Sequence, residues 1–341
     1  MTSTTPVPQS QPPAPPASAN AAGLPIGIFD SGVGGLSVLR HIRALLPHEH
    51  LIYFADSAFA PYGNKPEAFV TERALGIAEF LQGRGIKALV VACNTATVTS
   101  IKALRARHPD LPIVGVEPGL KPAAALSKNG KVGVLATDRT LAGEKFLALR
   151  AHISAASGAE FLLQGCTGLA DQIELGQLSS AATIALLERY IHPLLEQGID
   201  TLVLGCTHYP FVQPAIERII ERHGARPVTL ENTDAAAAPA DNAALARVDT
   251  GATVARVDTG AAVALVDTGA AVARQLARLL AAAGLLRQHA ASELSPDTDQ
   301  PRLEACTSAN PAMLENAFST LLGLHPHIEE ITISDNSKNI A

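Results

Sequence analysis

One strand sequence occurs twice in this chain, and both copies end in a cysteine. Residues 85–93 read GIKALVVAC and residues 198–206 read GIDTLVLGC, which agree in small or apolar character at most positions. A second pair supports the duplication, because residues 132–137 (VGVLAT) echo residues 26–31 (IGIFDS). A chain of 341 residues that carries the same strands twice is predicted to form two related domains.

Strand and helix patterns alternate along the first copy. Short apolar runs at 26–29, 51–55 and 88–92 indicate strands, and helical patterns occupy 36–46 and 66–82. Parallel strands need such crossover helices, which cover both faces of the sheet. The prediction is an α/β fold of two pseudo-symmetric domains, each a mainly parallel sheet flanked by helices, with the active site in the cleft between them.

The two cysteines that end the repeated strand, Cys93 and Cys206, indicate where a site lies and what it does. Ligands of open α/β sheets bind at the carboxyl ends of the strands, so each domain would offer one thiol there. Facing domains would bring the thiols to one substrate from opposite sides. Since thiol and thiolate are both accessible near neutral pH, the pair suits proton removal from one face of an α-carbon and delivery to the other. We therefore expect an amino-acid racemase.

Each cysteine has a candidate helper. Asp30 ends the first strand, and the next residue, Ser31, can donate a hydrogen bond to a substrate. His208 follows Cys206 by two residues, and Glu174 could orient the imidazole so that it activates the thiol. An Asp in this position is also common in turns and helix caps, which leaves a structural interpretation open. With the two cysteines, Asp30, His208 and Glu174 are the predicted catalytic residues.

Polar residues near the predicted strand ends indicate a pocket that binds an amino acid. Hydroxyl and amide side chains suit a substrate carboxylate or ammonium group, and a Pro-Tyr-Gly turn could point a backbone N–H inward. The predicted substrate-binding residues are Asp30, Ser31, Pro61, Tyr62, Gly63, Cys93, Asn94, Thr95, Thr137, Thr140, Cys206, Thr207 and His208. Any one of these residues alone is weak evidence for a pocket, since Thr and Asn are ordinary loop residues.

Composition excludes several classes of protein. The formal net charge is −6, and no stretch clusters Lys and Arg with aromatic residues, which argues against nucleic-acid binding. No window of about 18 apolar residues predicts a membrane span. The four cysteines form no CxxC pair and are too sparse for a disulfide framework, which favours a cytoplasmic protein.

Two segments of low complexity stand apart from these patterns. Residues 1–23 are rich in Pro, Ser and Ala and lack the basic and apolar regions of a signal peptide, so they predict a disordered tail. Residues 246–272 contain three similar nonapeptides, ARVDTGATV, ARVDTGAAV and ALVDTGAAV. These are interpreted as a tandem expansion in a surface loop.

A dinucleotide-binding oxidoreductase is one competing interpretation. Residues 32–35, GVGG, follow a strand, and Asp56 lies near the end of the next. The fingerprint fails in detail, because Ser37 stands at the third glycine position and Asp30 would place negative charge beside a pyrophosphate.

A zinc or Cys-His hydrolase using Cys166, Cys206 and His208 is a second competing interpretation. These residues lack the short, recurrent spacing of structural zinc sites, so no metal is expected. Cys166 is interpreted as a small buried apolar residue. A third possibility is a two-domain amino-acid binding protein whose cysteines are inert; it predicts no exchange of the substrate's α-hydrogen.

With these residues assembled, the chain resembles the glutamate racemases of the aspartate/glutamate racemase superfamily. The matching stretches are Phe29 to Val38 (FDSGVGGLSV), Pro61 to Gly63 (PYG), Ala92 to Ala96 (ACNTA), Val116 to Pro118 (VEP), Thr137, Thr140, Glu174 and Leu204 to Pro210 (LGCTHYP). They are long, ordered and specific. Aspartate racemases share the paired cysteines and remain an alternative.

The resemblance implies interconversion of L- and D-glutamate without cofactor or metal, which supplies D-glutamate for peptidoglycan. It implies that Cys93, assisted by Asp30, serves one face of the substrate, and that Cys206 with His208 and Glu174 serves the other. A homodimer is also implied. The implied division is a first domain of residues 24–117 and 229–341, a second domain of residues 118–228, and an insertion at 231–265.

Overall fold

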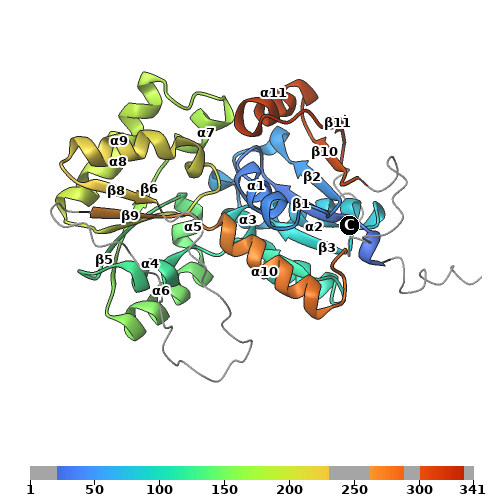
Figure 1. Ribbon diagram of the computed structural model, residues 1–341, viewed down its shortest axis with the longest axis horizontal. Coiled ribbons are helices and arrows are strands. Elements are labelled where there is room, and N and C mark those ends of the chain that lie inside the picture. Colours follow the sequence, from blue (N-terminus) through green and yellow to red (C-terminus); the bar gives the residue numbers. More distant parts are fainter. Residues whose placement is uncertain (1–20, 230–261, 288–299, 334–341) are drawn as a thin grey trace, which may run out of the picture.

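The computed structural model describes residues 21–229, 262–287 and 300–333. Two parallel sheets with helices on both faces lie side by side in the molecule (Figure 1). This confirms the predicted α/β fold. Within the described part of the chain, no helix is both long and apolar enough to cross a membrane.

The first sheet has six strands in the order β11-β10-β2-β1-β3-β4, and every pairing in it is parallel. Its strands are β1 (Ile26–Asp30), β2 (Leu51–Ala55), β3 (Ala88–Val91), β4 (Ile113–Gly115), β10 (Leu303–Thr307) and β11 (His327–Glu330). The helices α1 (Leu36–Leu45), α10 (Gly269–Ala282) and α11 (Pro311–Leu322) pack on one face, and α2 (Glu67–Gly83) and α3 (Asn94–Arg107) pack on the other.

The second sheet has five parallel strands in the order β6-β5-β7-β9-β8. They are β5 (Lys131–Ala136), β6 (Glu160–Gly165), β7 (Thr201–Leu204), β8 (Arg226–Thr229) and β9 (Ala262–Val266). One face is covered by α7 (Leu169–Glu174), α8 (Ala181–Glu196) and α9 (Gln213–Arg222). The other is covered by α4 (Leu120–Leu126) and α6 (Glu144–Ser157), and the short α5 (Asp138–Ala142) follows β5.

The sequence duplication is visible in the strand pairing. The order β2-β1-β3 in one sheet matches β6-β5-β7 in the other. Ile26 lies opposite Ala88 in the first sheet, and Val132 lies opposite Thr201 in the second. These are the same positions of the two repeated strand pairs, so the halves share register as well as order.

Strand β9 belongs to the second sheet, although it lies after residue 228, the predicted end of the second domain. The sequence interpretation placed residues 229–341 in the first domain, whereas β9 pairs with β7 and β8 of the second sheet. Its apolar side chains Val263 and Leu265 are buried there, which ties it to that core. The chain then enters α10 of the first sheet at Gly269. We propose a domain boundary between Val266 and Gly269, rather than at 228.

The low-complexity segments are only partly described. Of the predicted tail, residues 1–20 lie outside the described residues, whereas Ala21–Gly23 form a 3₁₀ turn whose Ala22 carbonyl accepts a 2.6 Å hydrogen bond from Lys87 Nζ. Of the predicted insertion, 231–261 lie outside the described residues. The third nonapeptide is not a surface loop, because it contributes to β9 and to the start of α10.

Candidate functional site

A pocket at the facing ends of the two sheets brings the two cysteines together. Cys93 and Cys206 each follow the end of a repeated strand, β3 and β7, by two residues. Both thiols are buried, at 5% and 6% exposure. The pocket is lined by Ser31, Pro61, Tyr62, Gly63, Cys93, Asn94, Thr95, Thr137, Ala170, Cys206, Thr207 and His208.

Three predicted site residues lie behind this lining. Asp30 is fully buried beneath Ser31, Thr140 contacts the pocket through other threonines, and Glu174 contacts it through His208. The sequence analysis missed Ala170. A signal for it existed, since Ala170 and Glu174 stand one helical turn apart on α7 and therefore share a face.

Cys93 occupies the N-cap of α3, and its sulfur contacts two polar groups. Its sulfur accepts a hydrogen bond from the Ala96 amide at 3.5 Å and donates one to Ser31 Oγ at 3.8 Å. Burial and then the charge of Asp30 raise the pKa of the Cys93 thiol well above its usual value, and the Ala96 amide only partly offsets them. A position at a helix N-terminus lowers the pKa of a thiol, but at Cys93 desolvation outweighs that effect.

Asp30 carries a buried carboxyl group whose two oxygens differ. Oδ2 accepts hydrogen bonds from the backbone amides of Gly35 at 2.7 Å and Gly32 at 3.4 Å, which anchors the turn after β1. Oδ1 is buried without a hydrogen-bond partner among the described residues. Burial raises the pKa of Asp30, against the attraction of His208. The turn interpretation of Asp30 is confirmed by these amide contacts, whereas its catalytic role stays a prediction.

Cys206 belongs to a chain of three groups. Its sulfur lies 3.4 Å from His208 Nδ1, and His208 Nε2 lies 2.6 Å from Glu174 Oε1. Burial lowers the pKa of His208, but Cys206 and Glu174 outweigh it and raise that pKa well above the ordinary value. The predicted carboxylate–imidazole–thiol contact is therefore present.

Three threonines join the two halves beside the pocket. Thr95 Oγ1 lies 3.1 Å from Thr137 Oγ1, and Thr140 Oγ1 lies within 3.4 Å of both hydroxyls. Next to them, neither polar side-chain atom of the buried Asn94 has a partner among the described residues. A buried amide without partners is available to hydrogen-bond a ligand.

Tyr62 lines the pocket with its ring and turns its hydroxyl away from it. The hydroxyl donates to Asp56 Oδ2 at 2.5 Å. Arg73 donates to both oxygens of the same carboxylate, at 3.0 and 2.7 Å. Asp56 and Arg73 were not predicted as site residues. Arg73 could have been noticed, because it interrupts the buried face of α2 formed by Val70, Ala74 and Ile77.

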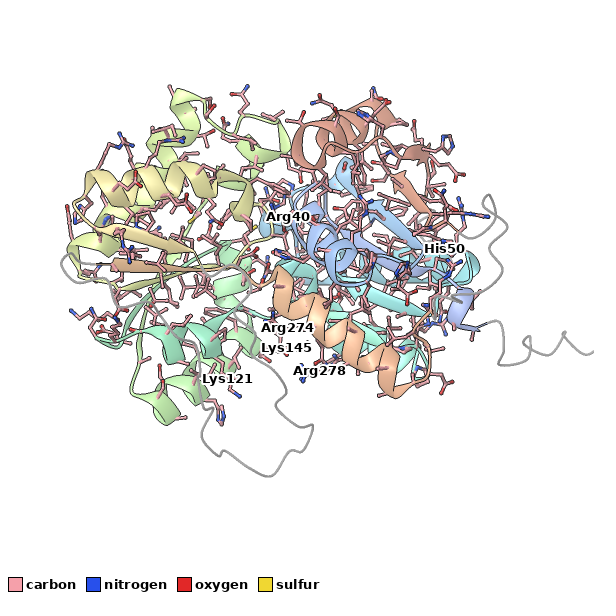
Figure 2. The ribbon with its side chains drawn as sticks, viewed as in Figure 1. Arg40, His50, Lys121, Lys145, Arg274 and Arg278 are labelled. Carbon is pink, nitrogen blue, oxygen red and sulfur yellow. The ribbon has the colours of Figure 1, made fainter. Side chains whose placement is uncertain are left out.

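Positive charge in the pocket comes from one residue. Among the lining residues, His208 alone is basic. Figure 2 labels basic side chains elsewhere, and these do not line the pocket: Arg40, His50, Lys121, Lys145, Arg274 and Arg278. Within the described ranges, no group of three His, Cys, Asp or Glu residues is arranged to hold a metal ion.

Comparisons with known proteins agree on one family. The sequence model of the Asp/Glu/hydantoin racemases matches residues 26–240. The chain is 44% identical over 313 residues to a glutamate racemase of Pseudomonas paraeruginosa, covering 92% of this chain and 99% of that protein. It is 57% identical over 188 residues to one from Methylococcus capsulatus, covering 55% of this chain and 68% of that protein.

Solved structures show the same similarity. Escherichia coli glutamate racemase, crystallised with L-glutamate and an activator, matches with a TM-score of 0.67 and 31% identity, covering 91% of this chain and 99% of that one. A glutamate racemase from Bacillus anthracis matches with a TM-score of 0.70 and 25% identity, covering 91% and 98%.

Proposed function

The chain belongs to the Asp/Glu/hydantoin racemase family and is an amino-acid racemase for glutamate, and we propose that Cys93 and Cys206 invert the substrate from opposite sides. The observation that carries the proposal is the shared pocket, to which each half contributes the cysteine that follows its copy of one strand. Neither thiol could reach both faces of one α-carbon, so a pair of them accounts for inversion in either direction.

The proposed reaction needs one thiolate and one thiol at a time. The thiolate takes the α-proton, forming an S–H bond as the Cα–H bond breaks and leaving the electron pair delocalised into the carboxylate. The opposite thiol then delivers its proton to the other face and becomes the thiolate. The enantiomer leaves with the protonation states of the cysteines exchanged, so the reverse reaction uses the same groups in reverse order.

The two sides are proposed to work differently. On one side, Ser31 contacts the Cys93 sulfur and Asp30 lies behind it. On the other, the His208–Glu174 pair lies beside Cys206 and is proposed to accept the proton of its thiol. His208 could also return a proton to the sulfur, because its Nδ1 lies 3.4 Å away.

Polar residues of the pocket lining, of which His208 alone is basic, are proposed to hold the substrate. Asn94 begins α3, where backbone N–H groups favour a carboxylate, and its unpartnered amide can bind either charged end of the amino acid. The remaining proposed contacts are Ser31, Pro61, Tyr62, Gly63, Thr95, Thr137, Thr207 and His208, with Thr140 supporting the other threonines from behind.

We also propose, from the family alone, that the product D-glutamate supplies peptidoglycan synthesis and that the protein acts in the cytoplasm as a homodimer. These proposals rest on similarity to the relatives and not on the geometry of the pocket.

Deuterium exchange tests the mechanism. Each enantiomer of glutamate is incubated in D₂O with the parent protein, Cys93→Ser or Cys206→Ser, and α-deuterium and chirality are followed separately. Each variant should lose racemisation, whereas Cys306→Ser, outside the pocket, should retain it. Normal racemisation by both variants would refute the two-thiol mechanism. If the parent protein does not exchange the α-hydrogen, the chain is better explained as an amino-acid binding protein. If aspartate exchanges faster than glutamate, aspartate is the preferred substrate.

A further inference from the structure

The glycine-rich loop of residues 32–35, GVGG, lies directly against the acid/base pair of the other half. The Val33 amide donates a 2.9 Å hydrogen bond to Glu174 Oε1, 141 residues away. A β-carbon on Gly32 would lie 1.9 Å from that same oxygen, and one on Gly34 would lie 2.5 Å from His208 Nδ1. The loop therefore leaves no room for side chains on the faces that meet Glu174 and His208.

Glu174 Oε1 receives contacts from both halves of the molecule. It lies 2.6 Å from His208 Nε2 in its own half and accepts from Val33 in the other. Glu174 is the last residue of α7, and its side chain is 15% exposed. A carboxylate in that place would have several rotamers open to it without a second donor.

The loop itself is held firmly from the first half. Tyr53, which is fully buried on β2, donates its hydroxyl to the Gly32 carbonyl at 2.8 Å, and the Gly35 amide donates to Asp30 at 2.7 Å. A second tie joins the halves nearby, since Ser37 Oγ donates to the Thr207 carbonyl at 2.8 Å. The donor that meets Glu174 therefore stands on a rigid support.

We propose that residues 32–35 are a positioning element for the acid/base group beside Cys206. The Val33 amide fixes the Glu174 carboxylate, and the missing side chains of Gly32 and Gly34 admit the Glu174–His208 pair. The inference rests on the proposed function of Cys206. It implies that this side of the reaction is complete only when the two halves are in contact.

A backbone requirement does not explain these glycines. Neither Gly32 nor Gly34 has a positive φ, so a left-handed conformation does not reserve either position for glycine. Glycine is needed at these two positions because a side chain would occupy the space that Glu174 and His208 fill. The loop does not form a phosphate-binding cradle, because side chains of the second half fill the space beside Gly32 and Gly34.

A double-mutant cycle tests the proposal. Gly32→Ala should lower kcat for racemisation on the order of 100-fold, the size of a general acid–base contribution. Gly83→Ala is the matched control, since a β-carbon there meets nothing within 4 Å. In a Glu174→Ala background the added methyl group meets no carboxylate, so Gly32→Ala should cost nothing further. An equal loss in both backgrounds would overturn the proposal, because the damage would then lie in the loop.

The ¹⁵N resonances of the His208 imidazole give a readout that does not need activity. They are assigned by their absence in His208→Gln and titrated without substrate. Gly32→Ala and Glu174→Ala should each shift the His208 titration toward lower pH, whereas Gly83→Ala should leave it unchanged. An unchanged His208 titration in Gly32→Ala would overturn positioning, even if the cysteine variants confirm the racemase mechanism. If Gly32→Ala does not fold, folding restored by Glu174→Ala supports the contact, and continued unfolding overturns it.

Discussion

Cys93 and Cys206 occupy the same position in two copies of one strand pairing. Cys93 stands five residues after Ala88, which lies opposite Ile26, and Cys206 stands five residues after Thr201, which lies opposite Val132. The thiols are thus equivalent in the backbone while their surroundings differ. The first half places Asp30 at the end of its inner strand, where the second half has Ala136.

Replacing Asp30 with Asn is expected to stabilise the protein at neutral pH and slow racemisation. Because burial raises the pKa of Asp30, the unfolded chain loses this proton at a lower pH than the folded chain, so stability falls as pH rises through that interval. Asp30→Asn removes this proton linkage, so it should gain stability on the order of 1 kcal/mol where the folded Asp30 would be charged. Urea unfolding of the parent protein and of Asp30→Asn between about pH 4 and 8 measures the difference in the free energy of unfolding. A loss of stability at pH 7 would contradict the prediction.

Asp267→Asn should have the opposite effect on stability. Burial raises the pKa of Asp267, but the hydrogen bonds from His41 at 3.1 Å and the Gly269 amide at 3.1 Å outweigh it, so the pKa is lowered overall. The stabilisation is complete above the unfolded pKa of about 4 and disappears as pH falls through the folded value. We expect a loss of about 1–2 kcal/mol at pH 7 that shrinks below pH 4. His41→Gln should reproduce part of that loss, and a pH-independent loss would argue against the ion pair.

The sequence predicted features that are set locally. Alternation of apolar runs and helical patterns located the strands, and the position of Cys93 and Asp30 at strand ends follows from where those runs stop. The similarity of residues 85–93 to residues 198–206 was enough to predict that Cys206 would be the counterpart of Cys93, because both segments are continuous apolar runs of strands buried on both faces, and each cysteine follows its run.

Long-range contacts could not be predicted in the same way. The Val33–Glu174 hydrogen bond joins residues of different halves, and no local pattern encodes the meeting of a loop with a distant helix end. The same limit applies to β9, whose pairing depends on the core that receives Val263. Buried charges such as Arg73 also run against the usual pattern, so their role becomes clear only with their partner Asp56.

The two cysteines outside the predicted mechanism should be dispensable for racemisation. Cys166 lies in the core of the second half and Cys306 in that of the first. Burial raises the pKa of Cys306 to about 11, so little thiolate forms at neutral pH. Cys166→Ala and Cys306→Ala should each keep kcat within about twofold while losing roughly 1–2 kcal/mol of stability to small cavities. A chiral assay measures kcat, and urea unfolding measures the stability of each variant. Loss of racemisation by Cys166→Ala would assign that thiol a role in the site.

Tyr62→Phe should separate support of the pocket from contact with the substrate. The Tyr62 hydroxyl is committed to Asp56, which Arg73 also holds, so removing it should cost about 1–2 kcal/mol of stability and leave kcat within about threefold. Tyr190→Phe is a matched control, because that hydroxyl donates to the Thr167 carbonyl at 2.7 Å outside the pocket.

Arg73→Met makes the complementary test of the same cluster. It leaves the Asp56 carboxylate buried without its cation, which should cost about 3–5 kcal/mol and raise KM by loosening the turn that carries Tyr62. Urea unfolding and steady-state kinetics on both enantiomers measure the two effects together. If Tyr62→Phe instead lost activity on the order of 100-fold at unchanged stability, the hydroxyl would have to leave Asp56 and act on the substrate itself.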